Sequence, residues 1–138
     1  MSRPTIDMIV YASWSQPTFK AAELEPLLEK ARADNEKNGL TGLLLARSGC
    51  FIQVLEGERY NLGYTFKKIR DDPRHHGVRI LLESSSDARL YSRWRMAYRD
   101  VDVMDPVLLQ MVDDAMQSRK KLTTADVNQL LKKVSSAL

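Results

Sequence analysis

Three polar side chains stand among apolar neighbours, on faces that a folded chain would keep dry. Gln53 shares a strand face with Phe51 and Leu55. Asn35 lies on an otherwise apolar helix face, and Tyr11 interrupts an apolar strand. A buried amide without partners costs about 1–3 kcal/mol, so these groups could satisfy one another or the backbone as parts of an ordinary core. Together, a phenol and two carboxamides would also suit a pocket for a planar heteroaromatic ligand with alternating donors and acceptors.

The sequence lacks the residue patterns typical of metal, dinucleotide, phosphate-binding and hydrolase sites. His75 and His76 are adjacent and do not converge on one metal ion, and the single cysteine, Cys50, excludes a disulfide and a thiolate cluster. The glycine-rich motifs of dinucleotide and phosphate binding and the nucleophile elbow of hydrolases are absent. An RNA-binding strand would carry exposed aromatic residues in a basic setting, whereas the run FIQVLEG offers a glutamine and a glutamate. We therefore predict no metal site and do not favour a nucleic-acid partner.

Composition favours one globular domain with a short appendage. The chain has 138 residues, of which 43% are hydrophobic and 28% charged, and its net charge is only +3. Neither the N-terminal segment nor any later run is apolar enough to predict a signal peptide or a membrane span. The expected location is cytoplasmic, without membrane contact.

The first half of the chain predicts three strands and a helix. Residues 6–13, 40–47 and 50–56 are rich in β-forming residues, and Ser48-Gly49 between the last two favours a hairpin. Apolar residues recur at helical spacing between the first two strands. They predict a helix from about Glu25 to Asn38-Gly39, where glycine ends it.

The next part of the chain predicts one more helix and two more strands. The helix is expected over residues 58–71 and a fourth strand over residues 78–82. A fifth strand is expected over residues 90–98, with Trp94 and Met96 on one face. The order β-α-β-β-α-β-β predicts an α+β, ferredoxin-like fold, in which two helices cover one face of a five-stranded mixed sheet.

Residues 99–138 are expected to form a C-terminal two-helix extension after a domain of residues 1–98. Asp105-Pro106 is typical of a helix start, and Thr123 with Asp126 has the spacing of a capping box. Both faces of the third strand are apolar, so the extension or another subunit is expected to cover the face that the helices leave. We therefore expect a homo-oligomer, with the extension as a further contact surface.

Five short segments match one known family in order and spacing, over about residues 5–98. They are Tyr11-Ala12-Ser13; Asn35 with Gly39–Leu45; Gly49–Gly57; Ile69–His75; and Arg89-Leu90-Tyr91 with Trp94-Arg95-Met96. With these segments the sequence resembles the BLUF family, blue-light sensors that use flavin. The resemblance implies that the chain binds FAD, with FMN or riboflavin as alternatives.

The resemblance also implies roles for individual residues. Asn35 would pair with N3–H and O4 of the flavin. Gln53 would lie between the phenol of Tyr11 and the flavin N5 and O4. The other side chains implied in the site are Leu27 and Ile69 beside the ring, Arg32, Lys68 and His75 toward the phosphates, and Asp34 and Phe51 elsewhere in the pocket.

Ordinary structural roles compete with several of these assignments. Leu27 and Ile69 could simply pack in the core. Arg32 and Lys68 could lie on a solvated helix face, and His75 could bind the backbone at a helix end. Asp34 departs from the family, which often has asparagine or another neutral polar residue there. Its charge would disfavour an anionic flavin nearby and so could alter affinity or dark recovery.

The photochemistry that the resemblance implies uses a phenol and an amide. The phenol of Tyr11 gives an electron to excited flavin, Gln53 relays the proton, and the Gln53 amide settles in a new orientation. Trp94 and Met96 are candidates to exchange places near Gln53, and the sequence does not decide which of them lies there in the dark.

We therefore expect a short photoreceptor without enzymatic activity that signals to a downstream protein in trans. Two alternatives from other classes are a flavin-free interaction module with the same fold and a flavin-dependent redox enzyme. A purified protein that stays colourless after flavin addition would favour the first. Steady oxidation of NAD(P)H would favour the second.

Overall fold

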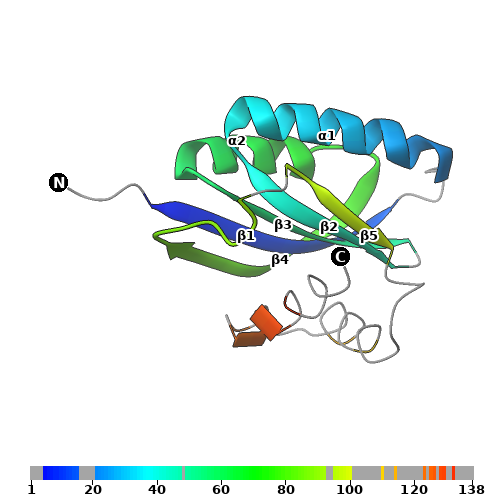
Figure 1. Cartoon of the computed structure of the whole chain (residues 1–138). Helices are drawn as coiled ribbons and strands as arrows, with labels where there is room; N and C mark the ends of the chain where they lie inside the picture. The colour runs from blue at the N-terminus through cyan, green and yellow to red at the C-terminus, as the bar shows by residue number, and fades with distance from the viewer. Residues whose placement is uncertain are drawn as a thin grey trace.

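Two helices lie on one face of a five-stranded sheet (Figure 1). The computed structural model describes residues 5–15, 21–47, 49–92 and 95–100, together with Gln110, Asp114, Thr123, Ala125, Asp126, Asn128, Gln129 and Lys132. Within these residues the arrangement is the α+β, ferredoxin-like fold that the order of elements predicts.

The sheet is mixed, as predicted. Its strands are β1 (Ile6–Ser15), β2 (Thr41–Arg47), β3 (Cys50–Gly57), β4 (His75–Ser86) and β5 (Ala97–Asp100). Their spatial order is β4-β1-β3-β2-β5, and only the β2–β5 pair is parallel among the pairings described. The first four strands confirm the predicted positions, and β4 extends beyond the predicted 78–82 at both ends.

Both predicted helices are present and end where local chemistry stops them. A short 3₁₀ turn, η1 (Ala21–Glu23), leads into α1 (Leu24–Asn38). Gly39 follows with φ of 67°, a left-handed conformation that glycine adopts without strain. The second helix is α2 (Arg59–Arg70), and the carboxylate of Glu58 caps it by accepting hydrogen bonds from two backbone N–H groups.

The predicted start of the fifth strand is wrong. Strand β5 begins at Ala97, which pairs with Leu43 of β2, and Leu90 is 58% exposed rather than part of a buried strand face. The carbonyl groups of Arg95 and Met96 accept hydrogen bonds from side chains of α1 instead of from a neighbouring strand. Met96 therefore precedes the strand and is not on a strand face as expected. Trp94, expected on the same face, lies outside the described residues.

Both faces of the sheet are buried. On the face away from the helices, Val10, Leu43, Ile52 and Val54 are each at most 1% exposed. Residues 99–138, the predicted cover of this face, lie almost wholly outside the described residues, and so does the predicted helix start at Asp105-Pro106. The expected homo-oligomer stays a prediction.

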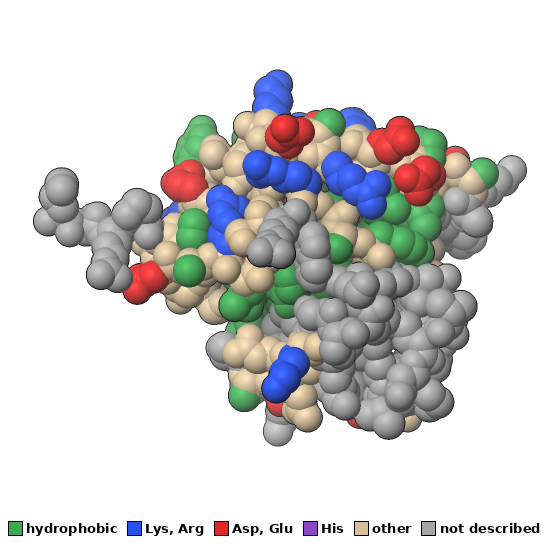
Figure 2. Space-filling model, viewed as in Figure 1, with side chains coloured by type: hydrophobic (Ala, Val, Ile, Leu, Met, Phe, Trp, Pro, Cys, Tyr) green, Lys and Arg blue, Asp and Glu red, His purple; other side chains and the backbone are tan. Residues whose placement is uncertain are grey.

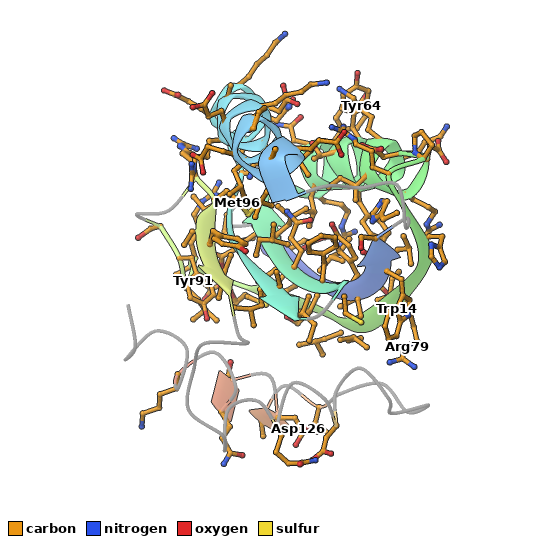
Figure 3. The ribbon with its side chains drawn as sticks, turned by 90° about the vertical axis from the view of Figure 1, so that its right-hand side faces the viewer. Trp14, Tyr64, Arg79, Tyr91, Met96 and Asp126 are labelled. Carbon is orange, nitrogen blue, oxygen red and sulfur yellow. The ribbon has the colours of Figure 1, made fainter. Side chains whose placement is uncertain are left out.

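One element of the C-terminal extension is described, and it confirms the predicted capping box. The backbone N–H of Thr123 donates to Asp126 Oδ2 at 3.0 Å, and the N–H of Asp126 donates to Thr123 Oγ1 at 3.1 Å. These hydrogen bonds lower the pKa of the Asp126 carboxyl. Asp126 lies on the side of the sheet opposite the helices (Figure 3).

The surface over the helices carries both signs of charge. Lys and Arg side chains lie among Asp and Glu side chains on the face shown in Figure 2, without a continuous basic stripe there. Among the described residues, no helix combines the length and the apolar character needed to cross a membrane.

Candidate functional site

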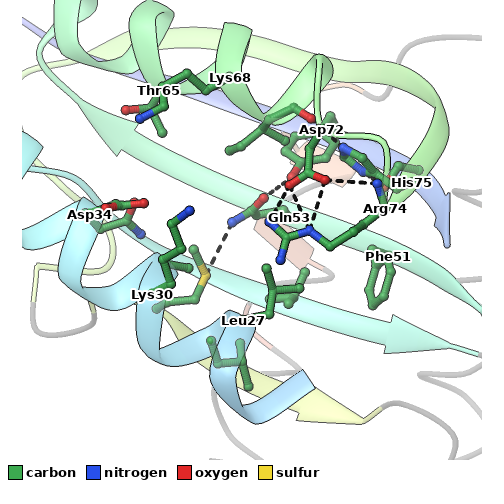
Figure 4. A pocket seen from close by; sticks show the side chains of 18 of the residues that line it. Leu27, Lys30, Asp34, Phe51, Gln53, Thr65, Lys68, Asp72, Arg74 and His75 are labelled. Atoms are coloured by element: carbon green, nitrogen blue, oxygen red, sulfur yellow. Dashed lines mark hydrogen bonds and ion pairs between the residues drawn. The ribbon is translucent and has the colours of Figure 1, made fainter. Parts of the chain in front are cut away.

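A cavity of about 560 Å³ lies between α1, α2 and the sheet (Figure 4). It brings together most of the side chains that the sequence singled out. Those that line it are Tyr11, Leu27, Asp34, Asn35, Phe51, Gln53, Lys68, Ile69, His75 and Met96. Alternation along β3 puts Phe51 and Gln53 on one face of the strand. Because both line the cavity, this is the face toward the helices.

A chain of hydrogen bonds runs through the floor of this cavity. Tyr11 of β1 lies directly opposite Gln53 of β3, and its hydroxyl donates to Gln53 Oε1. The amide nitrogen of Gln53 in turn donates to the sulfur of Met96 at 3.5 Å (Figure 4). Both arms of the Gln53 amide are therefore engaged, the acceptor by a phenol and the donor by a thioether. In the described structure the side chain near Gln53 is Met96.

The phenol of Tyr11 is held in an apolar environment. Its ring lies 5.4 Å from that of Phe66 and 6.5 Å from the imidazole of His75, which meets it edge-on. Burial raises the pKa of the Tyr11 hydroxyl far above its ordinary value, and the negative charge of Asp72 raises it further. The hydroxyl therefore keeps its proton and donates a hydrogen bond to Gln53 throughout the neutral and mildly alkaline range.

His75 binds the protein rather than only facing the cavity. Its Nε2 bonds to the carbonyl oxygen of Ile69 at the end of α2, and its Nδ1 lies 2.9 Å from Oγ of the buried Ser13. Of the two roles considered for His75, the structure shows the contact with the backbone at a helix end. The imidazole therefore fixes the end of α2 against β1, while its ring forms part of the cavity wall beside Tyr11.

Asn35 is buried at 3% exposure and faces the cavity from α1. One of its amide hydrogens is donated to the carbonyl of Arg95 at 2.6 Å. Within the part of the chain that the structure describes, this leaves its carbonyl oxygen and second N–H for a ligand. Such a pair of groups can meet one acceptor and one donor on the edge of a planar heterocycle.

Charged groups surround the outer end of the cavity. Lys30, Lys68 and Arg74 supply three cations, and Asp34 and Asp72 supply two carboxylates. Arg74 binds Asp72 through an ion pair of 2.6 Å, and this bonding lowers the pKa of the Asp72 carboxyl. The charge of Arg74 is therefore largely balanced by Asp72. The amino groups of Lys30 and Lys68 are exposed beside the cavity, and that of Lys68 lies 5.4 Å from the centre of the Tyr64 ring.

Arg32 is the predicted binding residue that the structure places elsewhere. It does not line the cavity; its Nε donates to the carbonyl of Met96 at 3.0 Å, and its guanidinium lies 3.8 Å from Glu25. Lys30, one helical turn before Asp34, takes a place at the cavity that the sequence analysis missed. Its i, i+4 spacing from Asp34 on α1 was the available signal.

The side chains that line the cavity combine apolar surface with polar groups, as a planar heterocyclic ligand requires. Thr65 Oγ1 of α2 is buried, lines the cavity and has no hydrogen-bond partner among the described residues. A native protein rarely leaves such a group unsatisfied. Apolar Leu27 and Ile69 face the same space from α1 and α2, as the two sides of an aromatic ring require. Together with the amides of Asn35 and Gln53, they fit a flavin.

Fold and site together define a flavin-binding sensor domain built on a ferredoxin-like sheet. Residues 6–97 match the family model described as sensors of blue light using FAD. The chain belongs to this family, the BLUF family, and is a flavin-binding blue-light sensor.

Two curated relatives and one solved structure illustrate the match. The chain is 33% identical over 95 residues to the photoactivated adenylate cyclase subunit alpha of Euglena gracilis, covering 69% of this chain and 9% of that protein. It is 28% identical over 119 residues to the blue light- and temperature-regulated antirepressor BluF of Escherichia coli (strain K12), covering 86% of this chain and 30% of that protein. The dark-state structure of BlrB, a BLUF protein, superposes with a TM-score of 0.79 at 22% identity, covering 99% of this chain and all of that one, and it supports the fold alone.

Proposed function

We propose that this chain senses blue light through a reorientation of the Gln53 amide, with FAD as its cofactor and without enzymatic activity of its own. The observation that carries the proposal is the chain of hydrogen bonds from Tyr11 through Gln53 to Met96. A primary amide carries an acceptor on one arm and a donor on the other. Turning it by half a rotation reverses the hydrogen bond with Tyr11 and removes the one to Met96, so the amide can act as a two-state element.

When bound, flavin supplies absorption of blue light and a strongly oxidising excited state. Tyr11 then acts as the electron donor, and its proton has a route along the hydrogen bond to Gln53 Oε1. The described arrangement, with the Gln53 nitrogen toward Met96, is assigned to the dark state. After reorientation the Gln53 oxygen would face the thioether of Met96, which has no proton to donate, so that contact is lost.

Met96 connects this switch to the rest of the chain. It immediately precedes β5, the described strand that leads toward residues 101–138. We propose that residues 1–98 form the sensor and that residues 99–138 contact a second copy of the chain or a downstream protein. A photoactivated adenylate cyclase subunit and a light-regulated antirepressor among the relatives carry the same domain, which supports an output through other protein parts.

The charges at the cavity predict which flavin binds most tightly. Lys30 and Lys68 are exposed beside the cavity, where they can attract a phosphate group. We expect FAD and FMN to bind more tightly than riboflavin. Replacing both lysines with glutamine should weaken binding of FAD and of FMN by roughly two- to thirtyfold and leave riboflavin unchanged, because each exposed charge pair contributes only about 0.2–1 kcal/mol.

Titration of the apoprotein with the three flavins, followed by flavin fluorescence, tests this proposal. Lys37→Gln, at an exposed lysine of α1 that does not line the cavity, is the matched control. Equal affinity for riboflavin and FAD in the unmodified protein would contradict a phosphate role for the lysines. A protein that binds none of the three flavins would instead be the flavin-free interaction module.

A further inference from the structure

A buried carboxylate lies outside the cavity, and the proposed photochemistry does not use it. Glu56 is only 1% exposed and follows Gln53 by three residues on β3. Its Oε1 accepts hydrogen bonds from the backbone N–H of Tyr91 at 2.6 Å and from the hydroxyl of Thr41 at 3.1 Å. Its Oε2 accepts from the N–H of Leu90 at 2.7 Å. Burial of a carboxylate is costly unless such bonds satisfy it.

Arg89, the residue before Leu90, adds three more hydrogen bonds in the same region. Its guanidinium donates to the hydroxyl of Thr41 at 3.0 Å, to the carbonyl of Glu56 at 3.1 Å and to the carbonyl of Gly39. We call Thr41, Glu56, Arg89, Leu90 and Tyr91 the Glu56 clamp. The clamp joins the end of α1, the start of β2 and the end of β3 to the chain that leaves β4.

Met96 follows Tyr91 by five residues, of which Arg93 and Trp94 lie outside the described part of the chain. Near Met96, Asn35 binds the carbonyl of Arg95, Arg32 binds the carbonyl of Met96, and Gln53 binds the Met96 sulfur. Figure 3 shows Tyr91 and Met96 on the same side of the molecule, beside β5. Strand β3 therefore contacts both ends of one short segment, through Glu56 at its start and through Gln53 at its end.

We propose that Glu56 is a positioning residue of the light switch. By fixing the N–H groups of Leu90 and Tyr91, it sets the path of the chain toward Met96 and so favours the arrangement in which the Met96 sulfur meets Gln53. This inference rests on the proposed roles of Gln53 and Met96. Loosening the clamp lowers the population of that arrangement and slows the return of Met96 to Gln53 after light.

The test uses Glu56→Gln in the flavin-loaded protein. Glutamine has nearly the same shape but only one acceptor oxygen, so its NH₂ group faces one of the two backbone N–H donors. The matched control is Glu83→Gln, at an exposed position on β4. The first readout is the NMR signal of the Met96 methyl group in the dark, in protein with ¹³C-labelled methionine methyls. Met96→Leu identifies that signal by removing it.

The second readout is the rate of dark recovery after blue light. We expect Glu56→Gln to move or split the Met96 methyl signal and to slow recovery by about two- to thirtyfold, the range that follows from reported couplings through packed networks. Glu83→Gln should change neither. In the Met96→Leu background, Glu56→Gln should no longer affect recovery, because the clamp acts through Met96.

Three results would overturn the inference. They are an unchanged Met96 signal in folded Glu56→Gln, recovery that is unchanged or faster, and an equal effect of Glu56→Gln with and without Met96. If the protein forms no light-shifted state, the proposed function fails, whereas the methyl signal, recorded in the dark, still decides whether the clamp positions Met96. If Glu56→Gln does not fold, Arg89→Lys takes its place, since it leaves the carboxylate of Glu56 with its Thr41, Leu90 and Tyr91 donors and removes the forked hydrogen bonds to the backbone carbonyls of Gly39 and Glu56.

Discussion

Replacing Gln53 with leucine is expected to abolish the light-induced shift of the flavin spectrum while flavin remains bound. Leucine fills a similar volume, but it can neither accept a hydrogen bond from the Tyr11 hydroxyl nor donate one to the Met96 sulfur. Without an amide there is no second hydrogen-bonding state for light to populate. The variant also leaves the buried Tyr11 hydroxyl without a partner, which should lower the free energy of unfolding by about 1–3 kcal/mol.

The measurement is the light-minus-dark absorption difference, with chemical denaturation for stability. The flavin-loaded variant should give no red-shifted difference band at any light dose. Gln129→Leu, at an exposed glutamine of the C-terminal region, should keep the full amplitude. A normal shift in Gln53→Leu would show that the amide is not the switch.

Replacing Tyr11 with phenylalanine should be almost as severe for the photoreaction, with a smaller effect on the fold. The phenyl ring keeps the contacts with Phe66 and His75, but the electron-donating phenol and its hydrogen bond to Gln53 are gone. We expect the red-shifted state to fall below detection and the fluorescence of bound flavin to increase, because its quenching donor is removed. Tyr60→Phe, at the exposed start of α2, should behave like the unmodified protein.

The raised pKa of Tyr11 adds a pH dependence to this comparison. Because the folded protein keeps the Tyr11 hydroxyl protonated, the amplitude of the light-induced shift should stay constant from pH 7 to about pH 10, where a free tyrosine ionises. Above about pH 10 only the unfolded chain releases this proton, so the contribution of Tyr11 to stability is lost as the pH rises. Denaturation at pH 8 and pH 10.5 should show a larger loss for the unmodified protein than for Tyr11→Phe. Ionisation of Tyr11 in the folded protein near pH 10 would contradict this.

The side chains at the centre of the site could be predicted from the sequence, because the spacing of residues within a single strand or helix decides which face they share. Alternation along β3 puts Gln53 beside Phe51 on one face, and helical spacing puts Asn35 on the inner face of α1. Their polar atoms had to find partners in a dry environment, which pointed to a shared cavity. The strand faces do not fix the register that sets Tyr11 directly opposite Gln53, because a shift of two residues would keep the same faces.

The entry to β5 could not be predicted from the alternation of side chains. Residues 90–98 alternate like a strand, but the carbonyls of Arg95 and Met96 bind side chains of α1, some 60 residues earlier in the chain. This tertiary contact replaces the strand ladder. It also explains why Arg32, expected near a phosphate, is used to hold the backbone instead.

Lys30 and Thr65 were missed for a related reason. A lysine or a threonine on a helix is most often solvated, and nothing in its neighbours along the chain says otherwise. Only the packing of α1 and α2 over one end of the sheet makes them part of the cavity wall. Sequence therefore identified the residues of the hydrogen-bonded switch better than the residues that surround the rest of the ligand.

The visible spectrum of the purified, flavin-loaded protein before, during and after blue light decides whether light reorients the hydrogen bonds around the flavin. We expect a structured flavin band that moves to longer wavelength under light, without loss of oxidised flavin, and returns in darkness. Bleaching of the band would indicate net reduction, as in a redox enzyme. A flavin band that neither shifts nor recovers would contradict the switch formed by Tyr11, Gln53 and Met96.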